Sequence, residues 1–163
     1  MRTKLAAGIT AITAVTIIGA AGVATASAGP AVARGEHLRI MNTEATSSRL
    51  SVIATGAFTA GGSVIPAAVT DMVVFPGGTF TFRHVSHSGT ASFNSSTCLL
   101  TETARGTFTI SHGTGKYAGI HGSGKFVTGI VAVTAKNHAG RCTHVQAPAT
   151  YQEIITATGT VSR

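Results

Sequence analysis

The strongest constraint on the fold of this 163-residue chain is a glycine-rich segment, residues 106–126, which joins two alternating runs. Before the glycines, Phe108 and Ile110 alternate with threonine and serine, the period-two pattern of a half-buried strand. A second alternating run begins at Lys125. Five glycines between residues 113 and 124 permit positive φ and close backbone approach. We therefore expect two strands joined by turns or bulges.

This segment also resembles a known family. Residues 113–124, with the sequence GTGKYAGIHGSG, resemble the signature between strands of the allene oxide cyclase and dirigent barrels. They are most similar to small secreted bacterial proteins with an allene oxide cyclase-like barrel. Weaker likeness in residues 75–82 and 157–161 extends the resemblance to about half of the mature chain. The resemblance implies a barrel and cofactor-free cyclisation or isomerisation of a small substrate. The acidic functional residues of those families lie in motifs that do not align here.

Alternation along the rest of the chain predicts an all-β fold with about eight short strands. The predicted strands are residues 37–42, 49–59, 69–75, 79–87, 90–94, 99–110, 126–136 and 151–161. Glycine, proline and serine clusters separate them, and residues 29–163 contain no sustained helical period. An antiparallel β-barrel is favoured over a sandwich, because closure removes exposed strand edges. An eight-stranded barrel holds one small ligand or packed side chains.

The N-terminus predicts export. Two positive residues precede an uncharged, apolar stretch at residues 5–23, and Ala26-Ser27-Ala28 then offers the small residues that a signal peptidase reads. We interpret residues 1–28 as a cleaved secretory signal and residues 29–163 as a single domain of a secreted, extracellular protein. The rival interpretation is a retained membrane anchor. The signal interpretation predicts no stable membrane insertion after cleavage.

Charge gives little indication of a macromolecular partner. The chain has a formal charge of +7, and loss of Arg2 and Lys4 leaves +5. The remaining basic residues are spread singly from Arg34 to Arg163, without the clusters and interleaved aromatics of single-strand-binding proteins. We therefore expect no nucleic-acid partner. A small apolar molecule and a second copy of the chain remain as candidate partners.

Cysteines and histidines indicate structure more than chemistry. Cys98 and Cys142 form a solitary pair in an exported chain, which predicts a disulfide. The alternative is a catalytic thiol, as associated with some allene oxide cyclases.

The seven histidines lack the spacings of transition-metal sites, so we expect neither a metal nor a cofactor. Residues 119–125 satisfy the phosphate-loop spacing, but Phe126 replaces the required Ser or Thr. These glycines are interpreted as backbone geometry, with Gly115 and Gly119 as candidates for positive φ.

Titratable side chains on apolar strand faces are the candidate catalytic groups. Asp71, Glu153 and His84 each continue such a face, and so does His112 beyond Ile110. A carboxyl or imidazole in a dry interior has a shifted pKa and can orient or protonate a ligand. Glu153 is the acid expected to reach the interior. The predicted ligand-binding residues are Phe80, Phe82, Phe108, Ile110 and Tyr151. The alternative is that each titratable group lies at a rim or faces water.

Two functions follow from these patterns. The first is a secreted, non-catalytic barrel protein that binds a small apolar ligand or a cell-surface component. The second is a cofactor-independent cyclase or isomerase that acts on a lipid or polyketide-like substrate inside the barrel. A connected cavity lined by the candidate acids would favour chemistry, whereas a core filled by phenylalanines would not.

Overall fold

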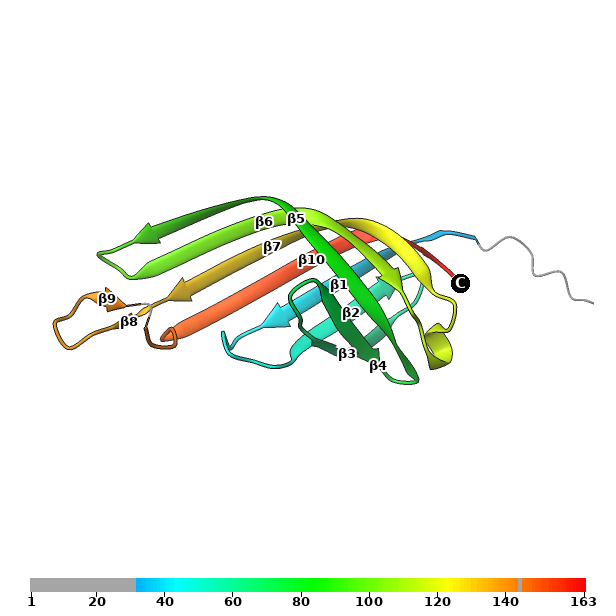
Figure 1. The fold of residues 1–163 in the computed structure, drawn as a ribbon, viewed down its shortest axis with the longest axis horizontal. Coiled ribbons are helices and arrows are strands. Elements are labelled where there is room, and N and C mark those ends of the chain that lie inside the picture. Colours follow the sequence, from blue (N-terminus) through cyan, green and yellow to red (C-terminus); the bar gives the residue numbers. More distant parts are fainter. Residues whose placement is uncertain (1–31, 144) are drawn as a thin grey trace, which may run out of the picture.

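The computed structural model describes residues 32–143 and 145–163, so the predicted signal segment lies outside the described residues (Figure 1). The described chain is all-β, with one short 3-10 turn, as alternation predicts. Its elements are β1 (Arg34–Asn42), β2 (Leu50–Gly56), β3 (Ala60–Ile65), β4 (Thr70–Phe75), β5 (Gly78–Asn94), β6 (Leu99–Ser111), η1 (Gly115–Tyr117), β7 (His121–Val133), β8 (Ala135–Lys136), β9 (Cys142–Thr143) and β10 (Thr150–Ser162).

Eight strands form a closed antiparallel barrel in the order β1-β10-β7-β6-β5-β4-β3-β2. From β1 to β7 each strand pairs with its successor in the chain, and β10 closes the ring between β7 and β1. Closure pairs the edges that threonine- and valine-rich strands would otherwise expose. The small β8–β9 hairpin stands apart from the ring, between β7 and β10 in sequence.

The strands differ in length, which gives the molecule an elongated shape (Figure 1). Strand β5 has 17 residues and β6, β7 and β10 have 13 each, whereas β2, β3 and β4 have six or seven. The long strands continue beyond the short ones as a four-stranded sheet, which we call the extension. It comprises residues 88–94, 99–105, 127–133 and 150–152. The extension lies beside one open end of the barrel.

Aromatic rings fill the opposite end of the barrel. Phe58, Phe75, Phe80 and Tyr117 lie with their ring centroids 5.2–6.3 Å apart. Aliphatic side chains from β1, β2, β3, β4 and β10 complete the same buried cluster. Burial of each large apolar side chain contributes about 1.5–3 kcal/mol. This half of the barrel is therefore a packed core.

Two expectations about the strands were wrong for the same reason. Pairing with neighbouring strands overrides the local tendency of glycine and serine to end a strand. Strand β5 continues through the expected break at Ser88-Gly89, because a bulge between Ser86 and Ser88 shifts the register without ending the pairing with β6. Strand β3 was missed, because Gly61-Gly62 was interpreted as a break. A Cβ at Gly62 would overlap the Val74 carbonyl and the Phe75 ring, so close approach by β4 requires glycine there.

Residues 112–120, the middle of the glycine-rich segment, form the turn between β6 and β7 that helps to close the filled end. The second strand, expected to begin at about Lys125, already begins at His121. Gly115 has φ +56° and Gly119 has φ +77°, so both candidate positions have positive φ. The turn places Tyr117 in the core. His112, expected to extend the face of Ile110, instead leaves the strand at φ +53° and is exposed. That expectation was wrong because alternation ends where the backbone turns.

The predicted disulfide between Cys98 and Cys142 is confirmed, with the two cysteines 44 residues apart. It joins the turn between β5 and β6 to β9. The β8–β9 hairpin is thereby tied to the tip of the extension. Burial of Cys98 and the backbone hydrogen bond from Thr134 to its carbonyl oxygen, 2.9 Å long, fix the same junction.

Candidate ligand pocket

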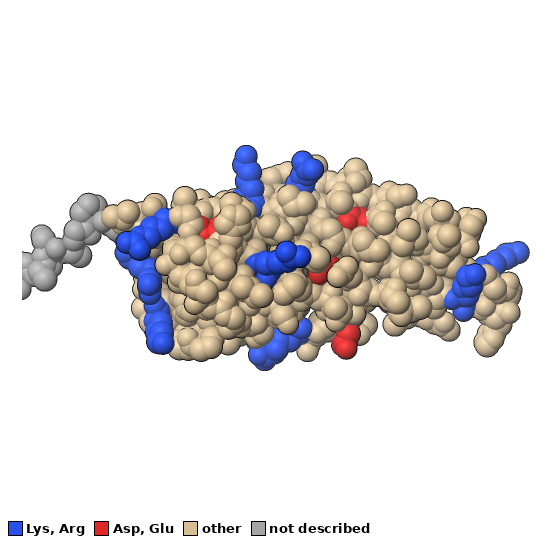
Figure 2. Space-filling view, turned by 180° about the vertical axis from the view of Figure 1, so that it is seen from behind, with Lys and Arg blue, Asp and Glu red and all other residues tan. Residues whose placement is uncertain are grey.

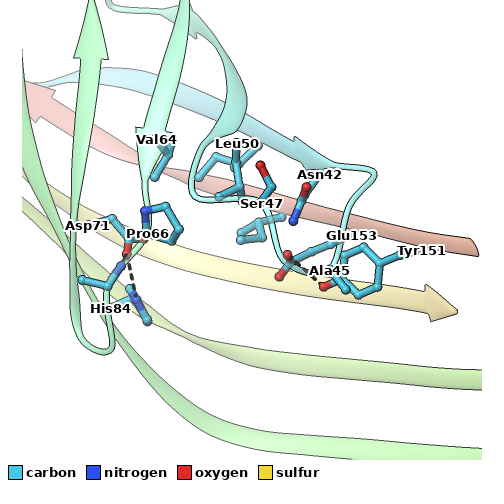
Figure 3. A pocket seen from close by; sticks show the side chains of 13 residues that line it. Asn42, Ala45, Ser47, Leu50, Val64, Pro66, Asp71, His84, Tyr151 and Glu153 are labelled. Atoms are coloured by element: carbon cyan, nitrogen blue, oxygen red, sulfur yellow. Dashed lines mark hydrogen bonds and ion pairs between the residues drawn. The ribbon is translucent and has the colours of Figure 1, made fainter. Parts of the chain in front are cut away.

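A pocket of about 300 Å³ opens at the barrel end beside the extension (Figure 3). We call it the mouth pocket. Its walls come from the inner faces of β1, β2, β3, β4, β5 and β10 and from the loops at residues 43–49 and 66–69. The lining residues are Ile40, Asn42, Ala45, Ser47, Leu50, Val64, Pro66, Ala67, Asp71, His84, Tyr151, Glu153 and Ile155. Apolar side chains form most of this wall, and polar groups stand at separate points on it.

The first polar group is the pair Asp71 and His84, from adjacent strands β4 and β5. Asp71 Oδ1 lies 3.6 Å from His84 Nε2 and accepts a 2.8 Å hydrogen bond from the Ala67 backbone N–H. The His84 backbone N–H donates to the Val69 carbonyl oxygen, 2.9 Å away, and so ties the loop to β5. The Asp71 side chain is 9 % exposed and that of His84 is 27 % exposed. The carboxylate is thus held by the loop while the imidazole reaches the pocket.

The side of His84 that faces the core is apolar. Its ring centroid lies 6.4 Å from that of Phe82 and 6.1 Å from that of Phe126, the latter in an edge-on arrangement. These rings belong to the packed core, and they orient the imidazole by contact. The Asp71–His84 pair therefore lies at the junction between the filled half of the barrel and its open end.

The second polar group is the pair Tyr151 and Glu153, two residues apart on β10 and therefore on one face. The Tyr151 hydroxyl donates a 3.2 Å hydrogen bond to Glu153 Oε2. Burial raises the pKa of Tyr151 to about 12, and the negative charge of Glu153 acts in the same direction. Tyr151 consequently stays protonated at neutral pH and remains a donor to the carboxylate. Figure 3 shows this pair across the pocket from Asp71 and His84.

The structure brings together Asp71, His84, Glu153 and Tyr151, all of which the sequence singled out as site residues. Phe80, Phe82, Phe108 and Ile110, expected to bind ligand, are not among the residues that line the mouth pocket. They are buried in the core, where Phe82 and Phe108 stack with centroids 4.7 Å apart.

Sequence reasoning missed the pocket rim. Asn42, Ser47, Pro66 and Ala67 line the mouth from the end of β1 and from the two loops. The proline break at residue 66 was visible in the sequence, but only closure of the ring places both loops at the same end of the barrel.

A further acid, Glu36, lies apart from the mouth pocket on the inner face of β1. It is 2 % exposed, and its Oε2 accepts a 3.2 Å hydrogen bond from the Phe58 backbone N–H. No hydrogen-bond partner within the described residues contacts Oε1. Burial raises the pKa of this carboxyl, and backbone hydrogen bonds oppose the effect only in part.

The described residues contain no group of three His, Cys, Asp or Glu side chains arranged to hold a metal ion. Residues 32–143 and 145–163 also include no helix long and apolar enough to cross a membrane. No protein-family model, curated protein or solved structure matches the chain. The chemistry of the mouth pocket is consequently the main guide to function.

Proposed function

We propose that this protein binds a small, largely apolar molecule in the mouth pocket. The observation that carries the proposal is a pocket of about 300 Å³ that combines buried apolar walls with a few convergent polar groups. That combination, at the mouth of a β-barrel, is typical of small-molecule sites. The packed aromatic end leaves the open end as the place where a ligand fits.

The proposal includes a place of action and a fold family. The signal-like N-terminus and the Cys98–Cys142 disulfide support an exported, extracellular protein. The closed eight-stranded barrel and the glycine-rich segment support a relationship with the allene oxide cyclase-like and dirigent-like barrels.

A second candidate function is cofactor-free cyclisation or isomerisation. The observation that favours it is the Asp71–His84 pair, 3.6 Å apart, across the same pocket from Glu153. Such groups can move a proton between two positions of a bound molecule, which is the step that an isomerase needs. Binding requires only the pocket, whereas catalysis also requires that the titratable groups be positioned for proton transfer. We therefore place binding without turnover first.

Neighbouring alanines allow a sharp test of binding. Ala67 lines the pocket from an exposed loop, and the adjacent Ala68 is exposed but does not line it. We expect 1-octanol, followed by amide chemical shifts, to perturb residues around the mouth pocket. A67F should abolish these shifts by filling the mouth, whereas A68F should preserve them. Shifts that lie elsewhere, or that survive A67F, would contradict the proposed site.

A separate measurement addresses catalysis. An enolisable α,β-unsaturated ketone in D₂O reports proton transfer as deuterium incorporation at carbon. The second candidate predicts incorporation faster than in buffer, lost in H84Q and E153Q and retained in A68F. Binding of the ketone without accelerated exchange would leave the non-catalytic proposal standing alone.

A further inference from the structure

Most acidic and basic side chains of this protein lie on opposite faces of the sheet. Four of the five acids that the structure describes have inward parity on their strands: Glu36, Asp71, Glu102 and Glu153. Every described Lys and Arg is exposed, and on β5, β6 and β7 each basic residue lies next to an inward residue and so faces outward. Figure 2 shows basic side chains protruding at both ends and in the middle of one face.

The charged side chains that line the mouth pocket come from this inward acidic set. Asp71 and Glu153 line it, and no Lys or Arg is among its lining residues. Within the described residues the one ion pair joins Asp71 to His84, so Glu153 has Tyr151 as its polar partner and no basic side chain. A carboxylate beside an apolar wall gains most from a cationic, hydrogen-bonding partner.

The acidic face continues from the mouth onto the extension. Glu102 and Glu153 both pair with Ile130, from opposite sides of β7, so the two carboxyls flank one apolar residue on the same face. The negative charge of Glu102 also contributes to the raised pKa of Tyr151. The negative field around the mouth therefore comes from three strands of the inner surface.

A second, apolar pocket adjoins the first. It has a volume of about 200 Å³ and shares Ala45 and Tyr151 with the mouth pocket. Its other lining residues are Leu100, Ala132, Thr134, Gln146 and Pro148, which bring it onto the inner face of the extension. The two pockets thus form neighbouring compartments, one with carboxylates and one mainly apolar, on either side of a shared wall.

Resting on the proposed function, we infer that the ligand is an amphiphilic amine, with its ammonium group between Asp71 and Glu153 and its hydrocarbon chain passing Tyr151 towards Leu100 and Ala132. The ammonium group adds charged donors to the two carboxylates, which already accept hydrogen bonds from the Ala67 N–H and the Tyr151 hydroxyl. The hydrocarbon chain of the ligand covers apolar surface on the extension, which the shorter strands β2, β3 and β4 do not reach. An anionic amphiphile would meet like charge at the same place, and a sugar would leave the apolar walls without a partner.

Three probes that share an eight-carbon chain separate the contribution of the head group to binding from that of the hydrocarbon. Octylamine, 1-octanol and octanoate at neutral pH share the hydrocarbon and differ in the head group. Calorimetry and amide shifts should show octylamine binding about 10- to 100-fold more tightly than 1-octanol, the range expected for a charge-assisted hydrogen bond. Octanoate should bind least. Added salt should weaken the binding of octylamine and leave that of 1-octanol nearly unchanged.

Carboxamide variants assign the preference to residues. E153Q and D71N should each reduce the preference for octylamine over 1-octanol by about tenfold, measured as the ratio of the two affinities in the same variant. E36Q makes the same change at a buried site that does not line the pocket, and should leave the preference intact. Because Asp71 also holds the Ala67 backbone, E153Q is the variant whose fold is least disturbed.

The outcomes distinguish the two proposals. If 1-octanol binds in the mouth pocket at least as tightly as octylamine, the binding function stands and the amine inference is overturned. If the preference for octylamine persists in both E153Q and D71N, the inference is also overturned. If none of the three probes binds, the proposed function fails, and the inference fails with it.

Discussion

Gly115 and Gly119 allow the cost of backbone geometry to be separated from the cost of steric overlap. Both have positive φ, +56° and +77°, where a Cβ is disfavoured by about 1–2 kcal/mol. A Cβ at Gly119 meets nothing within 4 Å, whereas one at Gly115 would overlap the Gly77 carbonyl. G119A therefore measures conformational strain alone, and G115A adds a clash with the turn between β4 and β5.

The magnitudes follow from the contacts. G119A should destabilise the protein by about 1–2 kcal/mol. In G115A the Gly77 carbonyl must move, which disturbs its 2.8 Å hydrogen bond from the Lys116 N–H, worth about 1 kcal/mol. The total for G115A is then about 2–3 kcal/mol, a substantial part of the 5–15 kcal/mol by which small domains are stable.

Gly129 supplies the control. It lies within β7 at ordinary φ with open space around its Cβ position, so G129A should stabilise the protein by about 0.5–1 kcal/mol. Urea unfolding of the three variants with the disulfide intact gives the comparison. Equal stability of G115A and G119A would refute the steric reasoning. Equal stability of G119A and G129A would refute the role of positive φ.

Three further comparisons test the disulfide, the buried acid Glu36 and the core. Replacing Cys98 and Cys142 together by alanine should lower the free energy of unfolding by about 4 kcal/mol, the chain-entropy value for a closed loop of this length; an unchanged urea midpoint would contradict this. Burial raises the pKa of Glu36 above its unfolded value, so the folded state binds the proton more tightly and stability falls as pH rises through the interval between the two values. E36Q should therefore gain stability relative to wild type as the pH rises above about 4.5, the ordinary pKa of a glutamate, and parallel pH profiles of the two proteins would refute the shift. Phe108→Ala should cost about 3–5 kcal/mol by thermal or urea unfolding, against at most about 0.5 kcal/mol for the exposed Val131→Ala; similar losses would show that Phe108 is not part of a tightly packed core.

The alternation of side chains placed several candidate residues correctly on inward faces, although it failed at His112, where the backbone turns. Asp71, His84 and Glu153 were selected because each continues an apolar strand face, and all three line the mouth pocket. This succeeds because the two-residue period of a strand is a local property of the backbone. The positive φ at Gly115 and Gly119 and the pairing of the two cysteines were predictable for similarly local or compositional reasons.

Position along the barrel was not predictable in this way. Phe82 and His84 share one strand face, yet Phe82 is buried in the core and only His84 reaches the mouth pocket. Period two distinguishes inside from outside, but it carries no information about which inward residues lie near the open end. That depends on strand lengths and on the side chains that fill the other end, such as Tyr117.

The sequence by itself determined that the chain is all-β, that Asp71, His84 and Glu153 continue apolar strand faces, and which glycines are candidates for positive φ, because each of these depends on neighbouring residues in the chain. Only the tertiary structure decided that β3 exists, that β5 continues across its bulge, and that the loops at residues 43–49 and 66–69 meet at one rim. These features depend on contacts between strands that are distant in sequence. The pocket between Asp71 and Glu153 is one of them, since the ring must close before β4 and β10 face each other.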